Sequence, residues 1–286
     1  MEKELVTIII PCYNAEPYLK KCFDSLLNQT YRNIEVIIVN DGSTDESEKI
    51  IDEYSKKFLK NNMKFMKINQ ENQGQAAAIN NALKFVSGTY LMWQDSDDWY
   101  ETDAVENLHD YLVNNNLNVL RGEAVFRDES DLSTIVYHAK SNSPCDNNLF
   151  DKYFFESDSY CFPGIFIIRM SHFDNCVKNR EIYCSRAGQN WQLILPVTYN
   201  EKSGYLNKIV YNYRISANSH SHSVKKLRDL IKRCDEHKDI LKHVLDDLNM
   251  KKKDKGRYII KLNIKYYKKK IRIILSHICN KLKGVK

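Results

Sequence analysis

The 286-residue sequence has little glycine and proline, with nine and five residues respectively. This scarcity excludes fibrous and low-complexity chains. The eight cysteines lack the paired spacing of a zinc site, and we expect free thiols in a reducing cytoplasm. No run approaches about 18 consecutive apolar residues, so no membrane-spanning helix is predicted. No signal-peptide pattern is expected either, because Met1 to Glu4 leads directly into a strand-like run.

Glycine-rich phosphate loops of the dinucleotide or P-loop type are also missing. This absence argues against a dehydrogenase or a nucleoside triphosphatase. A nucleotidyltransferase acting on sugar phosphates normally carries a Gly-rich loop with Arg or Lys after its first strand. Residues 11–15 read Pro-Cys-Tyr-Asn-Ala instead, which makes that class the weaker enzyme alternative.

Positive charge is concentrated at the C-terminal end. The formal net charge is +6, yet residues 251–286 hold 14 of the 43 Lys and Arg and only one acid, Asp254. The rest of the chain is therefore net acidic. The same segment has apolar residues at helical spacing, namely Ile260, Ile264, Tyr267, Ile271, Ile274, Ile278 and Leu282.

Residues 251–286 are therefore predicted to form a basic amphipathic helix that lies on an anionic membrane surface. Each cation near such a surface contributes about 1 kcal/mol. The alternative is a solvated helix that packs its apolar stripe on the body of the protein. Nucleic acid is not expected as a partner, because no motif for reading it accompanies the charge.

Strand-like and helix-like segments alternate through the first 113 residues. Such alternation implies right-handed crossovers and a mainly parallel sheet with helices on both faces, which is a Rossmann-like α/β fold. The expected strands are 6–10, 34–39, 63–68 and 90–94, and the expected helices are 18–27, 73–86 and 104–113. Farther along, we expect strands at 119–126, 162–169 and 205–213, a polar loop at 128–148 and a helix at 224–248.

Polar clusters follow three of the expected strands. They are Tyr13-Asn14, Asp41-Gly42-Ser43 and Asp95-Ser96-Asp97-Asp98. Ligands bind beyond the C-terminal strand ends of such sheets, so we expect the clusters to share one rim. Three acids within four positions repel one another and suit a hard divalent cation, Mg²⁺ or Mn²⁺. Each cluster alone has a local alternative as turn or helix-cap chemistry.

As an ordered set, these segments resemble family 2 glycosyltransferases, which have the GT-A fold. The resemblance rests on residues 6–14, 39–45, 71–74, 78, 80 and 95–99. It implies that Asp41 contacts the base, commonly uracil, that Asp95 lies toward the ribose and diphosphate, and that Asp97 binds the divalent metal together with Asp95. The donor-binding residues it implies are Pro11, Tyr13, Asn14, Asp41, Gly42, Asn72, Gly74, Asn80, Asp95 and Ser96.

A histidine pair, His220 and His222, lies downstream in the sequence. In an extended segment both side chains point the same way, because the period is two residues. A C-terminal His completes the metal or diphosphate site in several GT-A enzymes, so the resemblance adds this pair to the predicted metal ligands. A surface role without function is the alternative.

The sequence departs from the family pattern at two places. Ala78-Ile79-Asn80 lacks an Arg that the family often has, and Gly188-Gln189-Asn190 stands where many members carry Gly-Glu-Asp, whose Asp is the usual base. Asn190 cannot take up a proton at ordinary pH. The candidate catalytic residues are Asn190, Gln189 and Asp158, and Glu156 is a second spare carboxylate near Asp158.

The resemblance implies an inverting, metal-assisted glycosyltransferase that moves a sugar from a nucleotide donor, with UDP favoured, to a carbohydrate or lipid-linked glycan acceptor in surface-polysaccharide synthesis. We expect a donor-binding half at 1–120, an acceptor-binding half of the same domain at 121–222 and a helical extension at 223–286. The expected location is the cytoplasm, at the inner face of the cell membrane, and a homodimer is compatible with the sequence. The alternative is a catalytically impaired nucleotide-sugar-binding or scaffold protein at the membrane, motivated by Asn190.

Overall fold

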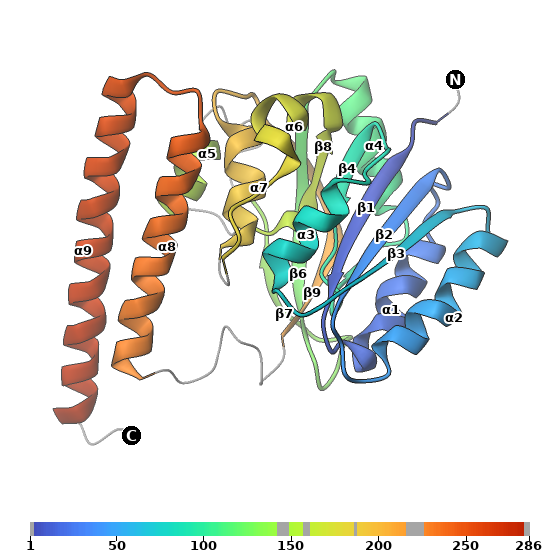
Figure 1. Ribbon diagram of the computed structural model, residues 1–286, viewed down its shortest axis with the longest axis horizontal. Helices are drawn as coiled ribbons and strands as arrows, with labels where there is room; N and C mark the ends of the chain where they lie inside the picture. The colour runs from blue at the N-terminus through green and yellow to red at the C-terminus, as the bar shows by residue number, and fades with distance from the viewer. Residues whose placement is uncertain (1–2, 142–148, 157–160, 186–187, 216–225, 283–286) are drawn as a thin grey trace.

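The computed structural model describes residues 3–141, 149–156, 161–185, 188–215 and 226–282 (Figure 1). Nine strands within these residues form a single sheet in the order β3-β2-β1-β4-β8-β6-β9-β5, and β7 pairs with β6. The strands are β1 (Val6–Cys12), β2 (Ile34–Asp41), β3 (Lys64–Gln70), β4 (Tyr90–Trp93), β5 (Trp99–Tyr100), β6 (Val119–Asp128), β7 (Ile135–Ala139), β8 (Phe166–Arg169) and β9 (Gly204–Ile215).

The parallel part of the sheet is centred on β1. Ile8 of β1 lies opposite Val36 of β2 and Met92 of β4, and β3 continues the parallel pairing beyond β2. Every residue of β1, β2 and β4 is buried, as expected for strands covered by helices on both faces. These strands confirm the four predicted from the apolar runs.

The helices of this half follow from the strand order. The chain runs outward from β1 to β3 through α1 (Glu16–Leu27) and α2 (Ser47–Lys60), and then returns to the other side of β1 through α3 (Gln75–Leu83). Right-handed crossovers therefore place α1 and α2 on one face and α3 on the other (Figure 1). The direction reverses between β1 and β4, where open α/β sheets form their ligand crevice.

The second half of the sheet is mixed. β8 is antiparallel to both β4 and β6, while β9 runs parallel to β6. The prediction of a loop at 128–148 is wrong in part, because β7 lies inside it. The β-branched and aromatic residues Ile135, Val136 and Tyr137 suit a strand, and β6 offers them an antiparallel edge. The predicted strand at 162–169 becomes a short 3₁₀ turn, η1 (Pro163–Ile165), followed by β8.

The remaining helices cover this half and extend it. They are α4 (Ala104–Asn114), α5 (Leu149–Phe154), α6 (Met170–Cys176), the turn η2 (Lys178–Arg180), α7 (Gln189–Thr198), α8 (Leu227–Asp247) and α9 (Lys252–Leu282). α8 and α9 lie side by side at the end of the molecule away from α2, and α7 contacts α8 (Figure 1). Within the described chain, no helix is both long enough and apolar enough to cross a bilayer.

The 31-residue helix α9 does not pack through the stripe read from the sequence. Leu262 and Tyr266 are buried, at 0% and 1% exposure, and they join the main core. Ile260, Ile264 and Tyr267 of the predicted stripe are 61%, 50% and 68% exposed. The alternative in which that stripe packs on the body is therefore wrong, because a different face of the helix makes the contact.

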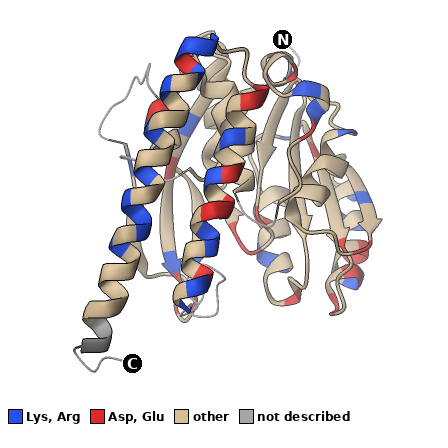
Figure 2. Ribbon diagram, turned by 60° about the vertical axis from the view of Figure 1, so that its left-hand side comes forward, with Lys and Arg blue, Asp and Glu red and all other residues tan. Residues whose placement is uncertain are grey.

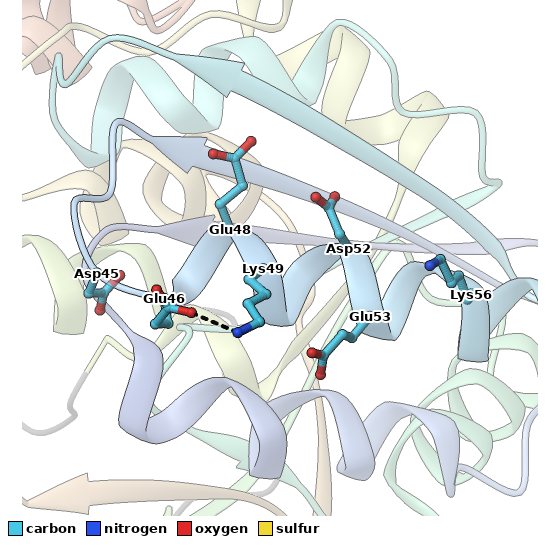
Figure 3. Close-up of a pocket in the computed structure, with 7 residues that line it drawn as sticks. All are labelled: Asp45, Glu46, Glu48, Lys49, Asp52, Glu53 and Lys56. Atoms are coloured by element: carbon cyan, nitrogen blue, oxygen red, sulfur yellow. Dashed lines mark hydrogen bonds and ion pairs between the residues drawn. The ribbon is translucent and has the colours of Figure 1, made fainter.

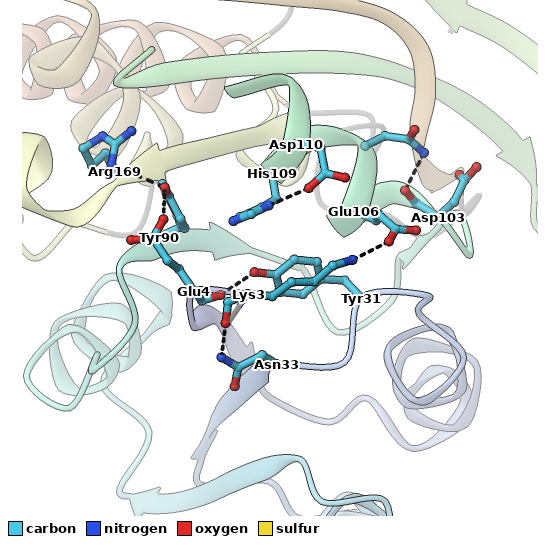
Figure 4. Close-up of polar contacts among 11 residues, drawn as sticks. Lys3, Glu4, Tyr31, Asn33, Tyr90, Asp103, Glu106, His109, Asp110 and Arg169 are labelled. Atoms are coloured by element: carbon cyan, nitrogen blue, oxygen red, sulfur yellow. Dashed lines mark hydrogen bonds and ion pairs between the residues drawn. The ribbon is translucent and has the colours of Figure 1, made fainter. Parts of the chain in front are cut away.

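A polar network lies at the N-terminal ends of β1 and β4, where the antiparallel strand β8 ends (Figure 4). The hydroxyl of Tyr90 donates to the Glu4 carboxylate at 2.6 Å and accepts a hydrogen bond from Arg169 at 3.3 Å. The hydroxyl of Tyr31 donates to the Glu4 carbonyl, and Lys3 pairs with Glu106 of α4. These contacts lie at the edge of the sheet opposite the predicted site, which is at the C-terminal ends of the parallel strands.

Candidate active site

Asp41, the last residue of β2, organises the loop that leads into α3. Its Oδ1 accepts hydrogen bonds from the Gln70 side chain at 2.7 Å and from the Gln73 main chain at 2.8 Å, and its Oδ2 accepts from the Gly74 main chain at 2.9 Å. A carboxylate has about four acceptor positions, so these three bonds leave one for an outside donor such as a base N–H. Asp41 is thus a structural anchor for the loop that leads into α3.

Asn14 joins the loops after β1 and β2, and Gly42 lets the loop after β2 approach residue 72 closely. The Asn14 main chain donates to the Ser43 hydroxyl at 3.0 Å, and its side-chain oxygen accepts from the Thr44 main chain at 2.8 Å. Gly42 has φ +71°, and a Cβ at this position would lie 2.8 Å from the Asn72 nitrogen. Glycine is therefore required both by the left-handed backbone and by the close approach of residue 72. The clusters that follow β1 and β2 thus share one rim, as predicted.

Other predicted donor residues have different surroundings. Tyr13 is 51% exposed beside Asn14, Asn72 is exposed, and Ser96 is half-buried. Pro11 is buried within β1. Asn80 is also buried, and its amide bonds the main-chain N–H and C=O of Ile182 at 2.9 and 2.8 Å.

This pairing ties α3 to the segment before α7 and gives Asn80 a structural role that the sequence did not indicate. The donor contacts assigned to Asn80 and Pro11 stay predictions.

Asp95, Asp97 and Asp98 form the acidic segment after β4, residues 95–98. The Asp95 Oδ1 accepts from the Gln75 side chain at 2.9 Å and from the Trp93 indole at 3.1 Å. Gly74 bonds Asp41 while Gln75 bonds Asp95, so consecutive residues at the start of α3 connect the two acidic clusters. The structure therefore brings together the acids that the sequence placed after separate strands.

Burial and mutual repulsion make the acidic segment hard to ionise. Burial, and then the neighbouring Asp97, raise the pKa of Asp95 to about 7. Burial also raises the pKa of Asp97, although Arg214 opposes this shift. The pKa of Asp98 lies well above its usual range, first through burial and then through Asp97 and Asp95. Added positive charge would stabilise the ionised forms of all three.

Two residues of β9 that the sequence did not single out complete this region. The Asp95 main chain donates to the Tyr211 hydroxyl at 3.1 Å. Arg214 donates from its main chain to the Asp98 carboxylate at 2.9 Å and from Nε to the Asp97 carbonyl at 3.0 Å. Its guanidinium also lies 4.8 Å from the Tyr18 ring centre. No sequence signal distinguished these residues, because they lie more than 100 positions from the acids they contact.

Asp95 and Asp97 fit a hard divalent cation through the chemistry of their oxygens and their raised pKa values. Mg²⁺ usually takes one or two carboxylates and completes its shell with waters and substrate phosphates. Among the described residues there is no cluster of three or more His, Cys, Asp or Glu side chains that could hold a metal by itself. His220 and His222 lie outside the described residues.

Asn190 and Gln189 begin α7. The Asn190 side chain donates to the Cys161 carbonyl at 3.2 Å, and the Gln189 side chain donates to the Ser185 carbonyl at 3.2 Å. Asn190 is thus tied to the segment before η1, whose Gly164 lies against the ring of Tyr211. Through this chain of contacts α7 is linked to the acidic segment, although neither of these hydrogen bonds reaches a carboxylate there.

Neither Glu156 nor Asp158 provides a general base among the residues that the structure describes. Glu156 binds Lys265 at 2.9 Å and Lys269 at 3.0 Å, both on α9. Although burial opposes the shift, these lysines lower the pKa of Glu156 to about 2. Glu156 is therefore a structural ion-pair partner, which contradicts its assignment as a spare carboxylate. Asp158 lies outside the described residues.

A shallow hollow over α2 is separate from these contacts (Figure 3). It is lined by Asp45, Glu46, Glu48, Lys49, Asp52, Glu53 and Lys56. Lys67 of β3 pairs with Glu48 at 3.2 Å and with Asp52 at 2.6 Å, and Lys49 pairs with Glu46 at 3.1 Å. These neighbouring cations balance much of the acidic charge, so the hollow has the character of a solvated helix face.

Comparison with known sequences identifies the family. Residues 7–177 match the family described as glycosyl transferase family 2. The chain belongs to this family. It is 35% identical to glycosyltransferase GlyA of Streptococcus pneumoniae over 220 residues, which cover 75% of this chain and 31% of GlyA. It is 37% identical to the uncharacterized glycosyltransferase EpsJ of Bacillus subtilis over 132 residues, covering 46% of this chain and 37% of EpsJ. The chain thus spans about a third of the length of these relatives.

Solved structures confirm the GT-A fold. S. aureus TarS 1–349 in complex with UDP-GlcNAc superposes with a TM-score of 0.68 at 17% identity, over 92% of this chain and 72% of that one. The mannosyltransferase PcManGT from Pyrobaculum calidifontis, in complex with GDP-Man and Mn²⁺, superposes with a TM-score of 0.59 at 13% identity. The match covers 93% of this chain and 70% of PcManGT. At these identities the likeness concerns the fold. The predicted GT-A fold with a C-terminal helical extension is confirmed.

Proposed function

We propose that this member of the family is an inverting glycosyltransferase that transfers a sugar from a UDP-linked donor to a carbohydrate or lipid-linked glycan acceptor, in cell-surface polysaccharide synthesis. The observation that carries the proposal is the connection of Asp41 and Asp95 through Gly74 and Gln75. It joins at one rim the acid that we assign to the base and the acid that we assign to the diphosphate. The UDP-GlcNAc complex of TarS, which has the same fold, supports a UDP-sugar donor.

The residues of the rim have distinct tasks in this reaction. Asp41 keeps one acceptor position for the base, and Tyr13 offers an exposed ring at the same rim. Asp95 and Asp97 would hold a divalent metal, which supplies positive charge to the leaving diphosphate. Arg214 fixes the Asp97 main chain and adds a cation close to the same carboxylates.

The acceptor hydroxyl must lose a proton during direct attack on the anomeric carbon. Asn190 occupies the position of the usual base, and its amide orients rather than accepts a proton. We assign Asn190, with Gln189, to positioning the acceptor, and Asp158 remains a candidate base. We place the reaction in the cytoplasm at the inner face of the cell membrane, with residues 251–286 directed to anionic lipid. This location suits an acceptor carried on lipid.

Calorimetric titration with UDP and with GDP, first with Mn²⁺ and then with EDTA, tests the donor site. We expect metal-dependent UDP binding that is lost in Asp97→Ala and kept in Glu53→Gln, which removes an exposed acid on α2. Absence of nucleotide binding under every condition would refute the proposal and favour a scaffold protein.

The second candidate is a nucleotide-sugar-binding protein without turnover, and Asn190 is the observation that favours it. Release of UDP from a UDP-sugar in the presence of acceptor separates the two. Metal-dependent binding without any release would establish the second candidate, whereas catalytic release establishes the enzyme.

A further inference from the structure

α9 has two apolar faces, and only one of them is covered. The inner face packs on α8 and on the core through Leu262, Tyr266 and Ile273. Around an ideal helix the uncovered residues fall within an arc of about 100° on the opposite side. This outer stripe consists of Ile260, Ile264, Tyr267, Ile271, Ile274, Leu275 and Ile278, all of them exposed.

The outer stripe is long as well as apolar. From Ile260 to Ile278 it extends roughly 27 Å along the helix, at about 1.5 Å per residue. Scattered single apolar residues on a protein surface need no explanation, but a continuous apolar band rimmed by polar residues marks an interaction site.

Charge along the stripe indicates what covers it. Lys261, Lys268 and Arg272 flank one side of it, are exposed, and form no ion pair with any described residue, although the Lys261 ammonium lies 5.7 Å from the centre of the Phe155 ring. Other cations of the helix are used internally, since Lys265 and Lys269 bind Glu156 and Lys270 binds Asp235. The unpaired cations therefore lie beside the apolar band, where an anionic surface would meet both.

α8 provides a contrast on the same side of the molecule. Its exposed positions carry charges of both signs, whereas the visible side of α9 is mostly blue and tan (Figure 2). A second copy of this chain is a poorer occupant, because an antiparallel two-fold contact through the stripe would bring the flanking cations of both copies together. Acidic lipid headgroups around acyl chains match the combination of exposed cations and an apolar band.

We infer that α9 docks flat on an anionic membrane through its outer stripe, while its inner face stays packed on α8. This inference specifies the surface used in the proposed membrane location and does not depend on the donor chemistry. Docking in this way requires no opening of the α8–α9 pair, because the residues that enter the lipid are already exposed.

Vesicle sedimentation of the full chain tests the inference, with neutral phosphatidylcholine vesicles compared with vesicles containing phosphatidylglycerol. We expect binding to the anionic vesicles and at least about tenfold weaker binding in the apolar variant Ile264→Gln/Tyr267→Gln/Ile271→Gln. The charge variant Lys261→Gln/Lys268→Gln/Arg272→Gln should bind the anionic vesicles more weakly by a similar factor. Its binding should also depend much less on salt.

The matched control is Leu59→Gln/Phe85→Gln, which removes exposed apolar side chains away from α9 and should bind vesicles as wild type does. Circular dichroism and UDP titration should be unchanged in all variants, which separates failure of docking from failure of the donor site. Wild-type vesicle binding by the apolar variant would overturn the inference. So would a wild-type dimer in solution that this variant converts to a monomer, because the stripe would then be a contact between two copies.

Discussion

The main-chain N–H of Arg214 donates to the buried carboxylate of Asp98 at 2.9 Å, joining the end of β9 to the acidic segment 116 residues earlier. The Arg214 side chain extends the contact by donating to the Asp97 carbonyl at 3.0 Å. One residue of β9 therefore fixes the backbone of the residue that we assign to the metal.

Arg214→Ala should weaken metal-dependent UDP binding by about tenfold or more. The variant loses a charged hydrogen bond, which contributes about 1.5–3 kcal/mol, together with a cation near the Asp97 carboxylate. Arg214→Lys should restore part of the affinity, because it keeps the charge without the planar fork. The measurement is calorimetric titration with UDP and Mn²⁺.

Arg180→Ala serves as the control, since Arg180 pairs with Asp174 on α6, away from the acids. UDP affinity equal to wild type in Arg214→Ala would show that Arg214 only supports the loop.

The pH dependence of stability should reveal the protonation of Asp95. Its pKa is about 7 in the folded protein against an ordinary value of 3.8, so the folded state holds an extra proton between these pH values. Stability of the metal-free protein therefore falls as pH rises through that window.

Asp95→Asn keeps the acceptor for Gln75 and Trp93 but cannot ionise. The melting temperature of the variant minus that of wild type should therefore become more positive as the pH rises from about 4 to about 8. When Mn²⁺ and UDP are added at about pH 8, wild type should instead melt at the higher temperature, because both ligands bind its ionised form. A constant difference across the pH range would contradict the raised pKa of Asp95.

The sequence allowed the parallel strands, the acid clusters and their common rim to be predicted, since these follow from local apolar runs and from the polarity of parallel strands. It did not reveal Tyr211 or Arg214, whose roles depend on contacts across more than 100 positions. The alternative prediction for α9 also placed the wrong face against the body. A spacing of three to four shows that Ile260 and Ile264 share a face, but not whether that face or the one containing Leu262 meets the body.

Gly164→Ala should destabilise the fold and disturb the site. A Cβ at Gly164 would lie 2.3 Å from the Tyr211 ring, and Tyr211 accepts the Asp95 main-chain hydrogen bond. Overpacking of this kind costs about 1–3 kcal/mol, measurable by urea unfolding. Gly256→Ala is the matched control, because nothing lies within 4 Å of its added Cβ. Replacing this helical glycine should increase stability by about 0.5–1 kcal/mol. Equal effects of the two substitutions would contradict the packing argument.

Asn190→Ala should lower turnover while leaving UDP affinity unchanged, because it removes the hydrogen bond to the Cys161 carbonyl at the start of α7. Asn190→Asp should remain active, since it supplies the carboxylate that many family members carry at this position. Steady-state rates with a UDP-sugar and acceptor, beside UDP titration, provide the comparison. Wild-type rates in both variants would make residue 190 a bystander.

The three hydrogen bonds that Asp41 accepts from residues 70, 73 and 74 have a consequence for the energetics of donor binding. The turn before α3 is already in its final shape when the donor arrives, so little conformational freedom is lost on association. Affinity should then depend mainly on the direct contacts with the nucleotide. Without the Asp41 carboxylate, this turn would become ordered only when a nucleotide binds. The affinity for every nucleotide would then fall by a similar factor.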